Sequence, residues 1–149
     1  MNRGQRLLWH GVLLFLLGLI TGLLSQKLTN PRMGLAAHLE GVMNGTFLLA
    51  IGAAWNRLHL SPRNERLAFR AALYGTYANW FTTTIAALFG TAAMTPLASG
   101  SFRGQNWQEL LVTVGFVSVA LAMITMSGLL LVGFKPHAVA EKFEEHENA

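Results

Sequence analysis

The sequence predicts an all-α protein, a bundle of four transmembrane helices with both termini in the cytoplasm. Of its 149 residues, 52% are hydrophobic and only 12% are charged, and aspartate is absent. This composition is typical of integral membrane proteins rather than of soluble domains. Four apolar blocks are each long enough to cross a hydrocarbon core of about 30 Å, which requires about 20 helical residues. We therefore expect one compact membrane domain.

The four apolar blocks define the predicted helices, which are residues 7–24, 33–55, 67–94 and 110–134. We expect residues 1–134 to form the transmembrane domain and residues 135–149 to form a polar cytoplasmic tail. The connectors contain strong helix breakers, since Pro31 and Pro62 stand in the first two and Pro96 opens the third. Because the connectors are short, consecutive helices are expected to run antiparallel.

Basic residues are distributed unevenly between the two sides of the predicted bundle. Of the 11 lysines and arginines, eight lie on the side of the N-terminus and three on the other side. By the positive-inside rule, this asymmetry predicts a multi-pass protein of the cytoplasmic (inner) membrane, with both termini inside. The basic residues lie between apolar spans rather than on a stripe interleaved with aromatics, so the net charge of +4 does not indicate a nucleic-acid partner. The eight residues are Arg3, Arg6, Arg57, Arg63, Arg66, Arg70, Lys135 and Lys142, and the three are Lys27, Arg32 and Arg103.

The absence of cysteine narrows the chemistry open to the chain. It excludes disulfides, thiolate-ligated haem, iron–sulfur clusters and haem attached covalently through cysteine. A metal or haem would have to be held by histidine, tyrosine, methionine or carboxylate side chains.

His38 is the histidine that lies deep within a predicted helix. An ionisable side chain at bilayer depth costs about 2.5–3.5 kcal/mol by insertion scales, and such residues face a protein interior, a cavity or a cofactor. If His38 holds a haem iron, the lack of a second histidine at matched depth leaves the sixth coordination position open for a small molecule. The alternative is a polar packing histidine. His10, at the edge of the first helix, is the rival ligand.

Small residues border His38 on the second predicted helix. Ala37, Gly41 and Gly45 recur at four-residue spacing, a pattern that lets another backbone or a flat ligand come close. Two interpretations follow: the stripe is a helix-packing surface, or Gly41 and Gly45 offer a face on which a porphyrin held by His38 can lie.

Polar side chains also occur within the second and third helices. Glu40 and Asn44 are i and i+4 neighbours that can share hydrogen bonds, and Asn44 is a candidate pocket-lining donor. For Glu40, a catalytic role and a contact between subunits remain open. Asn79 has donors and acceptors that hydrocarbon cannot satisfy, so we expect it to contact another helix or a ligand. Tyr77 lies nearby on a different face of the same helix.

Several short strings resemble the hydroxylaminobenzene mutase family, a group of small four-helix membrane proteins related to styrene oxide isomerase. The resemblance covers the four helices and leaves the tail uncovered, and its specificity rests mainly on the second and third helices. The strings are TNPRM at residues 29–33, AAHL at 36–39, NG at 44–45 and YGTYANW at 74–80.

The resemblance implies a homotrimer that binds a ferric haem b near its subunit interfaces. It implies that His38 is the axial ligand of the iron and that Asn44 lies near the substrate oxygen. Tyr77 and Asn79 would complete the catalytic pocket. The isomerase has an aspartate in the third helix that has no counterpart here, where Tyr74 takes the nearest place, and this departure fits a substrate other than the epoxide.

The expected activity is therefore that of an isomerase acting on a small aromatic substrate that reaches it from membrane lipid. Such a mutase rearranges an arylhydroxylamine, for example hydroxylaminobenzene to 2-aminophenol, with haem iron as Lewis acid, a reaction of aromatic compound degradation. The alternatives are an aryl epoxide isomerase that converts styrene oxide to phenylacetaldehyde, a non-enzymatic haem-binding or electron-transfer subunit, and a channel or transporter subunit.

Overall fold

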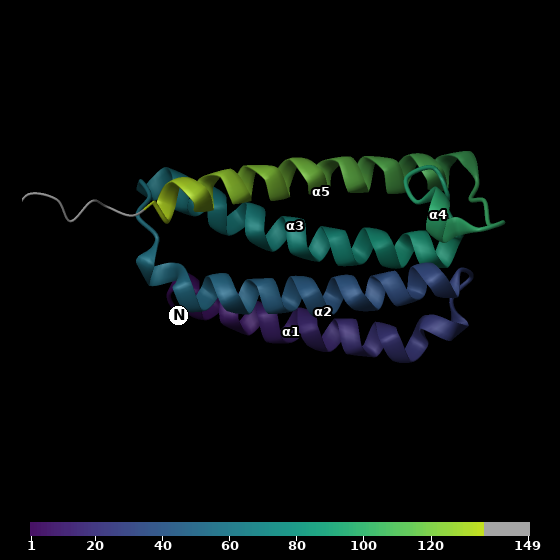
Figure 1. Ribbon diagram of the computed structural model, residues 1–149, viewed down its shortest axis with the longest axis horizontal. Helices are drawn as coiled ribbons and strands as arrows, with labels where there is room; N and C mark the ends of the chain where they lie inside the picture. Colours follow the sequence, from purple (N-terminus) through teal and green to yellow (C-terminus); the bar gives the residue numbers. More distant parts are fainter. Residues whose placement is uncertain (136–149) are drawn as a thin grey trace, which may run out of the picture.

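The computed structural model describes residues 1–135, and within them the chain is helical with no β-strand. Four long helices lie side by side, each antiparallel to the next (Figure 1). The single-turn helix α4 and two short 3₁₀ turns lie in the connectors. The elements are α1 (Arg3–Leu24), η1 (Ser25–Lys27), α2 (Pro31–Ala54), η2 (Trp55–Arg57), α3 (Pro62–Phe89), α4 (Pro96–Ser99) and α5 (Asn106–Gly133). The predicted tail, apart from Lys135, lies outside the described residues.

Three segments have the length and hydropathy needed to cross a membrane: Arg3–Lys27, Pro31–Arg57 and Asn106–Gly133. Length and composition therefore identify a multi-pass membrane protein. Helix α3 is as long as α5. It is less apolar than these three segments, because its first three turns contain three arginines, a glutamate and an asparagine, and its middle contains a second asparagine and four threonines.

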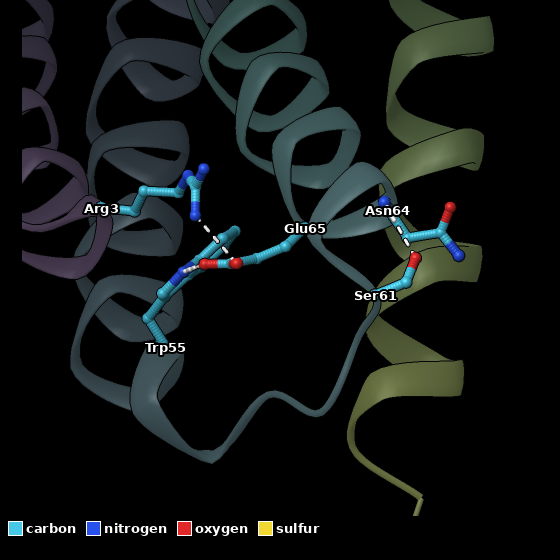
Figure 2. Close-up of polar contacts among 5 residues, drawn as sticks. All are labelled: Arg3, Trp55, Ser61, Asn64 and Glu65. Atoms are coloured by element: carbon cyan, nitrogen blue, oxygen red, sulfur yellow. Dashed lines mark hydrogen bonds and ion pairs between the residues drawn. The ribbon is translucent and has the colours of Figure 1, made fainter.

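Capping residues start two helices earlier than hydropathy alone indicates. The Asn2 side chain accepts a hydrogen bond from the Gln5 backbone at 2.8 Å, and the Gln5 side chain accepts one from the Asn2 backbone at 3.1 Å. This capping box begins α1 at Arg3 instead of residue 7. The Ser61 hydroxyl likewise accepts from the Asn64 backbone at 3.4 Å, so α3 begins at Pro62 instead of residue 67 (Figure 2).

The end of α3 and the connector that follows are shaped by a glycine and a carboxylate. Gly90 adopts the left-handed conformation at φ 65°, which stops the helix at Phe89 instead of residue 94. The Glu109 carboxylate then accepts backbone hydrogen bonds from Ala92, Ala93 and Gly104, each at 2.9–3.0 Å. These bonds fold the connector back onto the first turn of α5.

The helices form two pairs, α1 with α2 and α3 with α5, and the pairs meet mainly where α2 packs on α3 (Figure 1). Leucines, alanines and a methionine from these helices make the buried core: Leu7, Leu14, Leu48, Ala68, Ala72 and Met126 have no exposed surface. The α1–α2 pair is the closest, because glycines face each other across it. A Cβ atom added to Gly41 would lie 2.4 Å from the Gly18 Cα atom, so the two backbones are in direct contact.

Candidate functional site

His38 is held against the backbone of α1. Its Nδ1 atom lies 2.9 Å from the carbonyl oxygen of Gly18. Gly22 provides the space for the ring, since a Cβ atom at that position would come within 2.6 Å of the same nitrogen. The imidazole is therefore fixed by two α1 residues that are one helical turn apart.

This hydrogen bond determines which nitrogen of His38 is free. A carbonyl oxygen can only accept, so Nδ1 must carry a proton and donate it. In the neutral imidazole, Nε2 then keeps an unshared electron pair that can bind a metal. Histidine ligands of metals typically donate their other ring N–H to a carbonyl or carboxylate in this way, which fixes the orientation of the ring and increases its basicity.

Gly41 and Gly45 face α1 rather than an open pocket. A Cβ atom on Gly45 would lie 2.6 Å from the Phe15 backbone nitrogen and 2.8 Å from the Gly11 carbonyl oxygen. Both glycines are buried, and α1 occupies the surface that they offer. Both glycines therefore contribute to a helix-packing surface. On that face, the backbone of α1 packs directly against both glycines.

On the other side of α2, a carboxylate joins the two asparagines that the sequence singled out. Glu40 Oε2 accepts a hydrogen bond from Asn44 Nδ2 at 3.0 Å and a short one from Asn79 Nδ2. Asn44 is buried, and Glu40 and Asn79 are half-buried. Because Asn79 belongs to α3, this Glu40 cluster, consisting of Glu40, Asn44 and Asn79, links α2 to α3. Glu40 thus has its polar partners within its own chain.

Tyr77 lies apart from this cluster, next to the rival histidine. Its hydroxyl is 3.3 Å from the His10 carbonyl oxygen and 3.1 Å from His10 Nδ1, and the two rings meet edge to face with centroids 5.7 Å apart. If the tyrosine hydroxyl donates to the carbonyl, it accepts from Nδ1. Tyr77 and Asn79 are two residues apart on a helix, which turns their side chains about 200° away from each other.

The structure therefore separates the predicted site residues into three locations. His38 contacts α1, Asn44 and Asn79 meet at Glu40 between α2 and α3, and Tyr77 contacts His10. His38 and Glu40, which are also two residues apart, point to opposite sides of α2. No group of three or more histidine, cysteine or acidic side chains that could hold a bare metal ion occurs within residues 1–135. A metal held through His38 would need most of its ligands from a cofactor.

An apolar groove lies elsewhere, between α3 and α5. It has a volume of about 430 Å³ and is lined by Tyr74, Phe81 and Ile85 of α3 and by Leu111, Val114 and Ser118 of α5, among others. The Tyr74 hydroxyl lies 2.7 Å from the Ser118 hydroxyl at its wall. None of the predicted site residues lines this groove.

The fold and the site together define a small helical membrane protein with an oriented histidine on α2 and a polar cluster between α2 and α3. The chain belongs to the styrene oxide isomerase family, whose model matches residues 3–135. It is 46% identical over 132 residues to the hydroxylaminobenzene mutase HabB of Ectopseudomonas oleovorans, covering 88% of this chain and 80% of HabB. It is 43% identical over 124 residues to the mutase HabA of the same organism, covering 83% of this chain and 92% of HabA. No solved structure is a significant match to the chain.

These relatives identify the protein as an enzyme of the isomerase and mutase class. The resemblance found from short strings in the sequence is thereby confirmed, because both relatives carry the name that it indicated. The sequence also indicated the hydrogen bond between Glu40 and Asn44, through their i, i+4 spacing. The sequence did not reveal that Glu40 accepts a hydrogen bond from Asn79, because residue spacing along the chain does not indicate which side chains meet between two helices.

Proposed function

We propose that the protein is a membrane mutase that rearranges an arylhydroxylamine, such as hydroxylaminobenzene, to 2-aminophenol. The observation that carries this proposal is the likeness to two proteins named hydroxylaminobenzene mutase over more than four-fifths of the chain. The reaction moves a hydroxyl group from nitrogen to the ortho carbon without net oxidation, so it requires orientation and charge stabilisation rather than an electron acceptor.

We further propose that His38 holds a ferric haem b through Nε2. The chemistry of the donor fits this cofactor, because Nδ1 is engaged by the Gly18 carbonyl and Nε2 keeps its electron pair. One histidine suffices for a haem with an open position, whereas a bare metal ion would need more ligands. When bound, the haem supplies a Lewis acid that weakens the N–O bond of the substrate.

The Glu40 cluster is the part of the chain suited to orienting a substrate. Asn44 and Asn79 each donate one amide N–H to Glu40. Each also has an amide oxygen that can accept a hydrogen bond from the N–H or O–H of a hydroxylamine. Glu40 acts as a positioning residue, since its carboxylate fixes both amides at once. Tyr77 lies apart from this cluster, with its hydroxyl against His10, so its proposed hydrogen bond to the substrate would come from a different face of α3. The apolar surroundings exclude water, which would otherwise capture a cationic aryl species.

An oligomer explains how separated groups could form one site. Because His38 and the Glu40 cluster face opposite sides of α2, a neighbouring copy of the chain could bring its amide pair toward the side of the first copy on which His38 lies. We propose a homotrimer. We also propose that α3 is the fourth membrane crossing, since it runs alongside α2 and α5 over comparable length (Figure 1). Both termini then lie on the cytoplasmic side of the inner membrane, where most basic residues gather.

Turnover and absorption spectra of the purified protein test the proposal. In detergent, the protein should convert hydroxylaminobenzene to 2-aminophenol and should show a Soret band after expression with ample haem. His38→Ala should lose the band and the activity, whereas His10→Ala should keep the band. If haem-replete expression gives no Soret band while turnover persists, the iron role is wrong. If hydroxylaminobenzene is not converted at all, the mutase proposal is wrong.

An aryl epoxide isomerase is the second candidate, and the name of the matching family model favours it. This enzyme would open styrene oxide to phenylacetaldehyde with the same fold. Offering both substrates to the same purified sample separates the two activities. The mutase proposal predicts a kcat/KM for hydroxylaminobenzene that exceeds that for styrene oxide.

A further inference from the structure

Four arginines line one pocket at the end of the bundle where the chain begins. The pocket has a volume of about 450 Å³ and lies between the first turns of α1 and the first turns of α3. Arg3 and Arg6 come from α1, Arg66 and Arg70 come from α3, and Phe69 and Leu73 complete the lining. We call these six residues the arginine pocket.

Within residues 1–135, the carboxylate close to the arginine pocket is that of Glu65, and it already has partners. Glu65 Oε2 forms an ion pair with Arg3 at 2.8 Å, and Glu65 Oε1 accepts a hydrogen bond from Trp55 Nε1 at 3.0 Å (Figure 2). The hydrogen bond from Trp55 and the contact with Arg3 hold the pKa of the Glu65 carboxyl below its usual range, so the carboxyl is ionised at neutral pH. Glu65 therefore neutralises Arg3 and, in the part of the chain that the structure describes, leaves the charges of the other three arginines unpaired.

The remaining three guanidinium groups have no acidic partner within residues 1–135. Arg6 lies over the Phe69 ring, with its central carbon 5.1 Å from the ring centroid. Arg66 and Arg70 are exposed and one helical turn apart on α3. Like charges gathered around one concave surface repel each other, and a bound anion relieves that repulsion. Guanidinium groups are also the side chains best matched to phosphate oxygens, which they can contact through two N–H groups at once.

The pocket combines charge with an apolar floor at the edge of the membrane segments. Buried Phe69 and half-buried Leu73 face the same space as the arginines. The apolar run of α1 begins directly after Arg6, and exposed Trp9 one turn further on is typical of the membrane interface. An anion in this position would therefore meet apolar side chains on one side and water on the other.

We propose that the arginine pocket binds the phosphate group of an anionic phospholipid. The phosphodiester would contact Arg6, Arg66 and Arg70, and an acyl chain would lie along Phe69 and Leu73 toward the membrane interior. Basic pockets between membrane helices on the cytoplasmic side are suited to such headgroups. An inorganic phosphate ion would satisfy the charges but would leave the apolar floor without a partner. A phospholipid would contact both the arginines, through its phosphate, and the apolar floor, through an acyl chain.

Native mass spectrometry of the purified protein in neutral detergent tests this proposal with phosphatidylglycerol as the probe. The test variant is Arg66→Gln with Arg70→Gln. The matched control is Arg57→Gln with Arg63→Gln, which removes the same charge from exposed arginines at the same end that do not line the pocket. Taking about 1 kcal/mol per basic residue near a lipid surface, the test variant should bind phosphatidylglycerol about 30-fold more weakly than the wild type. The control should change by less than about threefold, because its charges are screened at physiological salt.

Three outcomes would overturn the proposal. An equal loss in the control would show that general surface charge, not the pocket, attracts the lipid. Equal binding of phosphatidylcholine and phosphatidylglycerol would show that net anionic charge is not recognised. Competition by inorganic phosphate at the same concentration as the lipid would show that the pocket serves a free anion. If the double variant fails to fold, as judged by gel filtration, each single variant should still weaken binding about fivefold.

Discussion

Replacing Gly18 by alanine tests the contact on which both the α1–α2 packing and the orientation of His38 depend. A Cβ atom at residue 18 would lie 2.6 Å from the Val42 backbone nitrogen and 2.7 Å from the Gly41 carbonyl carbon. Ordinary contacts of a Cβ atom begin at 3.4 Å. All the close atoms are backbone, so no side chain can rotate away. The helices must separate by about 0.8 Å at this point.

The expected cost follows from two opposing effects. Alanine favours a helix over glycine by about 1 kcal/mol. Forcing an extra methyl group into a close-packed contact costs about 1–3 kcal/mol. Gly128, in α5, provides the control, since a Cβ atom there has nothing within 4 Å. Both variants gain the same helix preference, so their difference isolates the clash. Gly18→Ala should be about 1–3 kcal/mol less stable than Gly128→Ala.

Unfolding in mixed detergent micelles, followed by circular dichroism as the fraction of sodium dodecyl sulfate rises, gives the two free energies of unfolding. The same separation would stretch the bond from His38 Nδ1 to the Gly18 carbonyl, now 2.9 Å, beyond hydrogen-bonding distance. Mutase turnover should therefore fall in Gly18→Ala and stay at the wild-type level in Gly128→Ala. Equal stability of the two variants would refute the direct backbone contact.

Three further variants test separate parts of the structure. Gly22→Ala places a Cβ atom against the His38 ring, which supplies the three nearest atoms. If His38 holds haem as proposed, the haem affinity measured by titration should fall about 10–100-fold while the fold is kept, and an unchanged affinity would contradict the assigned ring position. Glu40→Gln replaces charge-assisted hydrogen bonds by neutral ones, so the free energy of unfolding should fall by about 1–2 kcal/mol and kcat should fall with it. A variant as active as the wild type would show that Glu40 does not position the two amides. The pKa of Glu65 is lowered from its ordinary value of 4.5, so the stability that its carboxylate contributes is present above that pH and is lost as the pH falls through the lowered pKa. Glu65→Gln should therefore make the free energy of unfolding depend less steeply on pH in acid, and an unaltered pH profile would show that the carboxylate does not contribute to stability.

The helical class and the positions of the helices could be predicted because hydrophobic blocks and prolines act locally. Long apolar runs demand helices, since every backbone group must be satisfied within the segment. The boundaries shifted where polar caps extended the helices, as at Asn2 and Ser61. The crossing by α3 was predicted from a block at residues 67–94, yet its polar residues leave it below the hydropathy of the other long helices.

The candidate site was only partly predictable because spacing along one helix says nothing about the helix opposite. His38 was singled out by its depth, but the acceptor for its Nδ1 proton is a carbonyl of α1, and backbone carbonyls leave no signature in a sequence. Similarly, Asn79 was expected to meet a helix or a ligand, and its partner proved to be Glu40 of α2. For the stripe of Gly41 and Gly45, the pattern allowed both helix packing and a cofactor face, and only the position of α1 distinguishes them.

The two sides of α2 depend on each other through the same glycines. Gly18 and Gly41 let the α1 backbone approach α2 closely enough for a carbonyl to reach His38, which a bulkier pair would prevent. With α1 packed on that side, the polar Glu40 cluster must find its partners on the other side, and α3 supplies Asn79 there. A helix that carried only small residues would pack equally well but would orient neither the histidine nor the amides. The alternation of glycine and polar residues along α2 therefore explains both its close packing and the placement of the candidate catalytic groups.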